Sequence, residues 1–231
     1  MKKLLTLALA LAMVCVCALA AAEMGPTLNF KLAENQPDGN PITEGMKMFA
    51  ELANKYTEGT VTIDVYANGA LCDEASSMDQ LQLGSLDFSR VNTNSMASTI
   101  DEFGVFGMPY LFASTEQKYK ARDGEAGEYA MGLLDDYGMV GLYFWEAGAR
   151  CFYTTSKPIR SVEDLKGMKI RVPNATIYVD MFKDMGANPT TTAFSETYQA
   201  LQQGVVDGCE CDLANIVQQN WMEVNNYMSY T

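Results

Sequence analysis

Residues 164–174 read DLKGMKIRVPN and residues 193–208 read AFSETYQALQQGVVDG, and the order of elements in these segments decides the fold. In the first segment, apolar and polar residues alternate over 168–172, as in a strand, and Pro173 ends the run. In the second segment, Ser195 is placed to cap a helix, and a glycine stops that helix before another apolar pair. A strand, helices and a further strand in this order predict an α/β fold with parallel elements.

The same alternation extends outward through the sequence after residue 22. Strands are expected at 28–32, 61–65, 86–91, 139–145 and 150–155, and helices are expected at about 40–55, 74–84, 116–137, 174–186 and 212–224. The pattern restarts after Gly148, and there is no internal repeat or low-complexity linker. We therefore expect a first α/β domain at 23–148 and a second at 149–231.

The segment 1–22 is typical of a secretory signal peptide. Two lysines precede an apolar run at 4–19, and small residues lead to a cleavage point near Glu23. The run is short for a membrane span. Two cysteines within it raise the alternative of a lipid anchor, but valine precedes each of them where lipoprotein signals have a small residue. The sequence therefore predicts a secreted, periplasmic or otherwise extracytoplasmic protein.

Composition excludes several classes of function. The 231 residues include 16 basic and 29 acidic ones, and removal of Lys2 and Lys3 leaves a formal net charge of about −15. Such a chain lacks the basic surface that nucleic acids and anionic membranes require. It also contains no histidine, which removes the usual general base, the His-based triads and the commonest zinc ligand. We expect neither an enzyme nor a protein with a metal or cofactor.

Four cysteines remain after the signal peptide: Cys72, Cys151, Cys209 and Cys211. Although an exported protein can form disulfides, residues 209 and 211 are too close in sequence for an unstrained bridge. A single Cys-x-Cys pair without a second cluster is a weak indication of a metal site. The favoured interpretation is buried thiols, with a Cys-dependent exported enzyme as a less favoured alternative.

Arg171 is the first candidate for binding chemistry. It lies near the carboxyl end of its predicted strand, where open α/β sheets hold ligands, and the following helix start also favours an anion. A guanidinium pairs with a carboxylate through two parallel hydrogen bonds. The alternative is a solvated arginine on an edge strand. Arg150 is the second candidate, in a strand that crosses between the domains; its alternative is a surface arginine paired with one of the many carboxylates.

Three further residues have two interpretations each. Phe194 precedes a helix cap, and it is either a floor for the apolar part of a ligand or a residue that packs on its own helix. Glu74 and Asn92 follow strands of the first half. They either bind ligand hydroxyls or serve as a helix-start charge and a turn residue.

Several motifs together resemble the solute-binding proteins of TRAP transporters, the DctP-like family. The resemblance covers essentially the whole chain after the signal peptide. The motifs are residues 69–74 (GALCDE), 84–88 (GSLDF), 108–112 (MPYLF), 148–150 (GAR), 164–173 (DLKGMKIRVP), 200–202 (ALQ) and 206–208 (VDG).

The resemblance implies a two-domain, periplasmic-binding-protein-like receptor that closes its interdomain cleft around an organic acid. The receptor passes this ligand to small and large integral membrane subunits driven by an ion gradient. The family's carboxylate-clamping arginine falls on Arg171, the arginine of the crossing strand on Arg150 and the aromatic residue on Phe194. Its acidic and polar ligand contacts fall on Glu74 and Asn92.

The chain departs from the family at two positions. Cys211 stands where the family often has a ligand-contacting asparagine. Ser95 stands where sialic-acid receptors have an arginine, which disfavours sialic acid. The family also continues well past residue 231, so we expect the sequence to be a C-terminally truncated fragment.

The sequence therefore predicts an extracytoplasmic receptor for an organic acid. Glu74, Asn92 and Arg90 favour a hydroxylated sugar acid such as a hexuronate, with a dicarboxylate next. The alternative that the sequence does not separate from transport is a sensory domain that reports its bound ligand to a membrane kinase.

Overall fold

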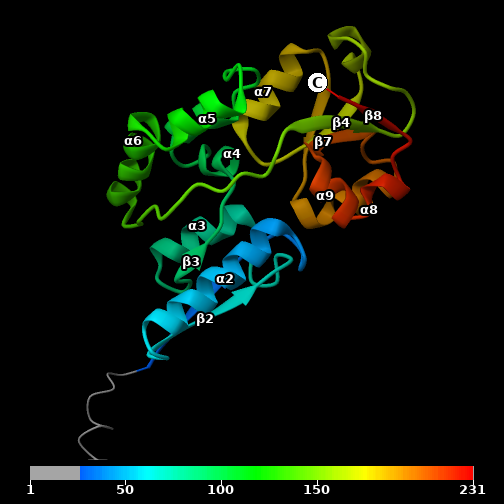
Figure 1. Cartoon of the computed structure of the whole chain (residues 1–231). Coiled ribbons are helices and arrows are strands. Elements are labelled where there is room, and N and C mark those ends of the chain that lie inside the picture. The colour runs from blue at the N-terminus through cyan, green and yellow to red at the C-terminus, as the bar shows by residue number, and fades with distance from the viewer. Residues whose placement is uncertain (1–26, 231) are drawn as a thin grey trace, which may run out of the picture.

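The computed structural model describes residues 27–230, arranged around two separate sheets (Figure 1). The predicted signal peptide and its two cysteines lie outside the described residues. No helix in 27–230 combines the length and the apolar character that crossing a membrane requires. The mixed arrangement of strands and helices confirms the α/β fold class.

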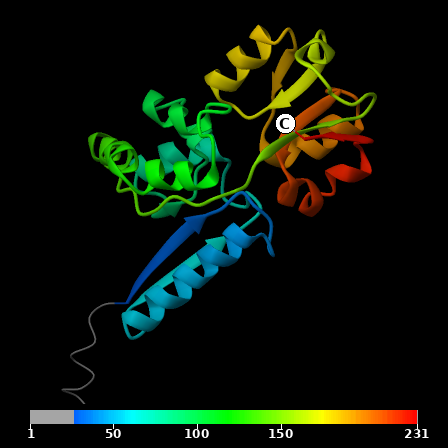
Figure 2. The same ribbon diagram turned by 45° about the horizontal axis from the view of Figure 1, so that its top comes forward.

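The first sheet has the strand order β2-β1-β3, and all its pairs are parallel. Its strands are β1 (Leu28–Ala33), β2 (Val61–Tyr66) and β3 (Phe88–Ser89). Helix α2 (Pro41–Tyr56) packs against it through a core of buried residues: Leu32, Ile42, Met46 and Ile63. Figure 2 shows this helix and the two long strands projecting together from the rest of the molecule. As the Asn-Pro sequence predicts, Asn40 caps α2 by accepting a hydrogen bond from the backbone of Ile42.

The remaining elements of the first half are short helices. They are α3 (Glu74–Gln82), α4 (Thr93–Met96), a 3-10 helix at Asp101–Gly107, α5 (Thr115–Arg122), α6 (Glu125–Leu133) and a 3-10 turn at Leu134–Tyr137. They share a second core around Phe103, which is 2% exposed.

The second sheet has five strands in the order β6-β5-β7-β4-β8. Its strands are β4 (Arg150–Thr154), β5 (Lys169–Val172), β6 (Asn188–Thr191), β7 (Gly208–Asp212) and β8 (Tyr227–Ser229). Strand β5 runs parallel to β6 and β7, whereas β4 runs antiparallel to β7 and β8. The helices of this half are α7 (Thr176–Asp184), α8 (Thr197–Gln202) and α9 (Leu213–Gln218), with 3-10 turns at Val162–Leu165, Phe194–Glu196 and Trp221–Glu223.

Several predicted elements differ from the structure. The helix expected at 116–137 is broken at Gly124, which adopts an extended conformation and begins α6. The strand expected at 139–145 is absent: residues 138–149 pair with no strand of either sheet. The short strand expected after Gly204, at residues 205–206, begins later in the chain, at Gly208, and is β7. The segment between α6 and β4 is an irregular connection between the two halves (Figure 2).

Side-chain hydrogen bonds join the two halves between the N-terminal end of α2 and helix α9. The Asn40 amide donates to Asn215 Oδ1 at 3.2 Å and to Gln218 Oε1 at 2.7 Å, and Gln218 donates back to the carbonyl of Gly39 at 3.1 Å. Asn40 and Asn215 are buried. Asn40 therefore both caps a helix and contacts the other half of the molecule.

We expect Asn40→Ala to lower the free energy of unfolding by more than the loss of a helix cap alone. Removal of an N-cap costs about 1 kcal/mol, and the loss of the partner of a buried amide adds about 1–3 kcal/mol. Urea unfolding followed by circular dichroism measures the difference. The matched control is Ser114→Ala, because Ser114 caps α5 at an exposed position and contacts only its own helix. Equal losses in the two variants would contradict a role of Asn40 between the halves.

Candidate functional site

Arg171 lies in the interior of the second sheet, and within residues 27–230 no carboxylate pairs with its guanidinium. Its strand β5 has neighbours on both sides, and the residue is only 3% exposed. Its Nε and Nη2 atoms donate to the carbonyl oxygen of Thr192 at 3.1 and 2.6 Å. Burial lowers the pKa of this guanidinium. The alternative of a solvated arginine on an edge strand is therefore wrong.

Arg150, at the start of β4, forms an ion pair with Glu210 on β7. Its Nη2 donates to Glu210 Oε1 at 2.8 Å, and its Nε donates to Oε2 of the same carboxylate. Burial disfavours the charge of Arg150, but the attraction of Glu210, together with smaller contributions from Cys211 and Tyr178, raises the pKa of the guanidinium. The guanidinium also lies 5.6 Å from the ring centre of Tyr178 on α7. The sequence left open whether Arg150 pairs with a carboxylate of the protein, and the structure shows that it does, with Glu210.

Cys211 lies on the same strand as Glu210, close enough to both arginines to feel their charge. Its Sγ donates to Asp212 Oδ2 at 3.6 Å. Burial raises the pKa of the Cys211 thiol to about 12, and Arg150 and Arg171 only partly oppose this. A thiol of this kind is protonated at neutral pH, and therefore a poor nucleophile.

We expect a thiol reagent to modify one cysteine of the mature native protein at pH 7. Cys72 is partly exposed, whereas Cys151, Cys209 and Cys211 are buried and none of the four is in a disulfide. Measured with Ellman's reagent, about one equivalent should react in buffer and three more only in denaturant. Cys72→Ser should abolish the native reaction. Rapid labelling of Cys209 or Cys211 in the folded protein would contradict this prediction and revive the thiol-enzyme alternative.

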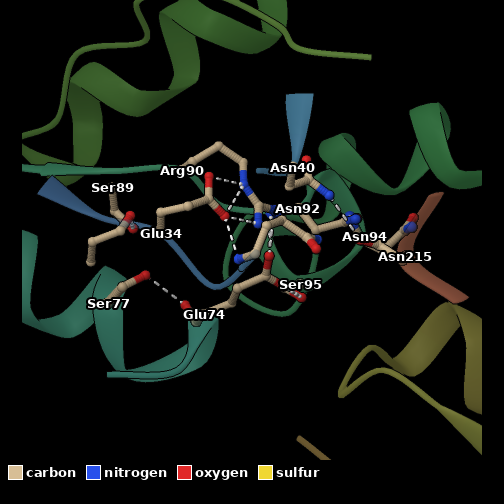
Figure 3. Close-up of polar contacts among 12 residues, drawn as sticks. Glu34, Asn40, Glu74, Ser77, Ser89, Arg90, Asn92, Asn94, Ser95 and Asn215 are labelled. Carbon is tan, nitrogen blue, oxygen red and sulfur yellow. Dashed lines mark hydrogen bonds and ion pairs between the residues drawn. The ribbon is translucent and has the colours of Figure 1, made fainter. Parts of the chain in front are cut away.

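Glu74 begins α3 and takes part in a buried network with Arg90 and Glu34 (Figure 3). Arg90 Nη1 donates to Glu74 Oε1 at 2.7 Å, and its Nε donates to the two oxygens of Glu34 at 3.1 and 3.0 Å. The side chain of Glu34 is fully buried, that of Arg90 is 10% exposed and that of Glu74 is 15% exposed. The network holds together the carboxyl ends of β1 and β3 and the start of α3.

Asn92 and its neighbours extend this network toward the second half. Asn92 caps α4, and its backbone N–H donates to Glu74 Oε1 at 3.2 Å. Ser95 Oγ donates to Glu74 Oε2 at 2.8 Å. Between them in sequence, the buried Asn94 donates from Nδ2 to the hydroxyl of Tyr178 at 3.1 Å. Because Tyr178 also lies against Arg150, a continuous row of polar side chains leads from one half to the other.

Phe194 lies in the core of the second half, apart from this row. Its ring packs against that of Trp221, with ring centres 5.2 Å apart. It remains partly buried and contacts the cluster that includes Cys211. The interpretation of Phe194 as a packing residue therefore has a structural basis, while a contact with ligand stays a prediction.

The structure thus gathers the predicted residues into two groups. Arg171, Arg150 and Cys211 form one group on the second sheet, and Glu74 and Asn92 belong to the other at the end of the first sheet. Two surface hollows of the described chain lie elsewhere. One is on α5 and the other lies between the 3-10 helix at Asp101–Gly107 and α6, and neither is lined by a predicted site residue.

Sequence reasoning missed the partners of these residues: Glu34, Asn94, Tyr178 and Glu210. Glu34 follows β1 directly. Its place at the carboxyl end of a strand was the signal available in the sequence. The other three depend on pairings between distant segments, for which the sequence carries no local signal.

A family model, that of bacterial extracellular solute-binding proteins, family 7 (DctP), matches residues 32–231. The C4-dicarboxylate-binding periplasmic protein DctP of Rhodobacter capsulatus is 35% identical over 83% of this chain and 57% of its own length. A solute-binding protein of Chromohalobacter salexigens is 34% identical over 84% of this chain and 58% of its own length. The chain therefore spans somewhat over half the length of these relatives.

Solved structures agree in fold. A TRAP periplasmic solute-binding protein of Sulfitobacter sp. NAS-14.1 with bound β-D-galacturonate has a TM-score of 0.84 and 34% identity. This comparison covers 87% of this chain and 67% of that one. The corresponding protein of Sulfurospirillum deleyianum with bound succinate has a TM-score of 0.84 and 31% identity, covering 88% and 66%. The family match over nearly all described residues and the agreement with two-domain structures show that this chain belongs to the DctP family of TRAP-type extracellular solute-binding proteins.

Proposed function

We propose that this protein is the extracytoplasmic receptor of a TRAP-type secondary transporter and that it binds an organic acid through Arg171. The observation that carries the proposal is the burial of this arginine without a carboxylate partner in the described chain. A buried charge without a counterion is costly, and a ligand carboxylate supplies the missing charge together with two hydrogen bonds. Family membership supports the same function.

The proposed ligand site joins the two groups of side chains. Arg171 pairs with the carboxylate, while Arg150 and Cys211 lie beside it. Glu74 and Asn92 face the remainder of the ligand, and Phe194 contacts its apolar part. These residues belong to proposed domains at 23–148 and 149–231. Closure of the domains follows ligand binding because the salt bridge is fully formed only in the closed state.

Relatives indicate which acids to test. Solved TRAP proteins similar to this chain hold galacturonate, glucuronate, succinate and galactonate. Another relative, from Escherichia coli, is a 2,3-diketo-L-gulonate-binding periplasmic protein. We propose a hydroxylated sugar acid as the ligand, with the small and large membrane subunits of the transporter as partners after export to the periplasm. No enzymatic step is part of this function.

A thermal-shift screen over these acids tests the proposal. A ligand that binds only the native state raises its melting temperature, and does so more at higher concentration. At least one sugar acid should raise the melting temperature of the wild-type protein, while the uncharged parent sugar should not. Absence of any shift with all carboxylic acids, or an equal shift with neutral sugars, would overturn the proposal.

A further inference from the structure

The two groups of the proposed site differ in how their charged side chains are paired. In the second half, Glu210 neutralises Arg150, and the charge of Arg171 remains without a carboxylate partner in residues 27–230. In the first half, two carboxylates, Glu34 and Glu74, share the single guanidinium of Arg90. No other basic side chain within the described residues forms an ion pair with either glutamate. One end of the site therefore holds a buried guanidinium without a salt bridge, and the other end has two carboxylates for one guanidinium.

The acidic end offers acceptors rather than donors. Glu34 and Glu74 are acceptors when ionised. Within the described residues, their oxygens accept hydrogen bonds from Arg90, from Ser95 and from the backbone of Gln36 and Asn92. The side-chain oxygen of Gln36, a residue only 5% exposed, is buried without a hydrogen-bond partner. A buried acceptor of this kind is satisfied by a ligand donor such as a hydroxyl.

A row of hydrogen bonds and one ring contact connects Glu74 at the acidic end with Arg150. Ser95 and Asn92 contact Glu74, Asn94 between them contacts Tyr178, and the ring of Tyr178 lies 5.6 Å from the guanidinium of Arg150. Figure 3 shows Glu34, Arg90 and Glu74 beside Asn92 and Ser95, with Asn94 leading away from them. This row leads from Glu74 to Arg150, which the proposed function places beside the bound carboxylate.

We infer that Glu34, Arg90 and Glu74 act together as a charge filter that selects acids with one carboxylate and hydroxyl groups at the far end, and excludes diacids. This inference rests on the proposed function and specifies its ligand class. A second carboxylate at the far end would lie near an excess negative charge in a water-poor site, and its repulsion would lower affinity. A hydroxyl at the same position would instead donate a hydrogen bond to a carboxylate.

Two matched pairs of ligands test the filter by calorimetry. D-galactonate and galactarate have the same configuration at their secondary hydroxyls and differ only in a terminal CH2OH or carboxylate, and D-gluconate and glucarate form a second such pair. The wild-type protein should bind the monoacid of at least one pair about tenfold or more tightly than its diacid. Equal affinity within the pair, or preference for the diacid, would overturn the inference and leave the proposed function intact. Absence of binding to all carboxylic acids would overturn both.

Glu74→Gln tests the role of the excess charge. The amide keeps the shape of the side chain and its acceptor oxygen, so that Ser95 and Arg90 retain a partner. The variant should weaken monoacid binding and narrow the monoacid-to-diacid ratio by about tenfold. The matched control is Glu51→Gln, which removes one negative charge from the exposed surface of α2 and should leave the ratio unchanged. An unchanged ratio in Glu74→Gln would contradict the filter, since a purely structural role would alter stability and not discrimination.

Discussion

Replacing Arg171 by methionine is expected to abolish acid binding without lowering the stability of the ligand-free protein. Loss of a buried partner of a ligand charge costs about 2–5 kcal/mol, or a factor of about thirty to several thousand in affinity. The substitution changes the stability of the ligand-free protein in two opposing ways. The carbonyl of Thr192 loses its donors, at a cost of about 1–3 kcal/mol. In the other direction, the substitution removes the buried charge of Arg171, and this stabilises the ligand-free protein by several kcal/mol.

Calorimetry with the best acid of the screen and urea unfolding without ligand measure the two effects separately. The matched control is Arg160→Met, because Arg160 lies in the same half with its side chain exposed. We expect that control to keep both affinity and stability. Retained affinity in Arg171→Met would end the role of Arg171 as the carboxylate partner. A large loss of stability would instead identify it as a structural residue held by Thr192.

Replacing Trp221 by alanine is expected to destabilise the second half by about 3–5 kcal/mol, the usual cost of deleting a large aromatic side chain from a core. Trp221 is 0% exposed and packs against Phe194. Trp221→Phe should cost distinctly less. Phenylalanine keeps much of the volume of the tryptophan side chain. The indole N–H that this substitution removes has no hydrogen-bond partner in the structure. Urea unfolding followed by far-UV circular dichroism measures both variants.

The control for this prediction is the other tryptophan of the chain, Trp145. It is 43% exposed and contacts Gly45 of α2 from the irregular connection. Trp145→Ala should therefore cost much less than Trp221→Ala. Comparable losses at the two positions would mean that the core around Phe194 contributes less to stability than its burial indicates, and would favour the interpretation of Phe194 as a ligand contact.

Much of the fold was predictable because its signals are local. Alternation over 168–172 predicted β5, and the Asn-Pro pair at 40–41 predicted the start of α2. The strand predicted at 139–145 was wrong for a nonlocal reason. Its apolar residues suit a central strand, but whether a segment becomes a strand depends on pairing with a distant segment, and residues 139–145 pair with no strand of either sheet.

The candidate site was predictable only in part. The position of Arg171 near the end of its strand, together with the family motifs around it, identified the proposed anion contact. Its burial was not foreseen, because alternation alone placed it on the polar side of an edge strand. Glu74 was expected either to bind ligand hydroxyls or to serve as a helix-start charge; it does begin α3, and the structure adds a pairing with Arg90, sixteen residues further along the chain.

Local sequence was sufficient for most element types, for the cap of α2 and for the family, since each depends on neighbouring residues or on a linear order of motifs. Tertiary structure alone decided the charges of the site. Arg150 meets Glu210 across sixty residues and Arg90 meets Glu34 across fifty-six, whereas Arg171 reaches a backbone carbonyl in place of a carboxylate. Whether a buried charge has a partner depends on which distant strands become neighbours, and that pairing leaves Arg171 without a salt bridge and gives Glu34 and Glu74 a single shared guanidinium.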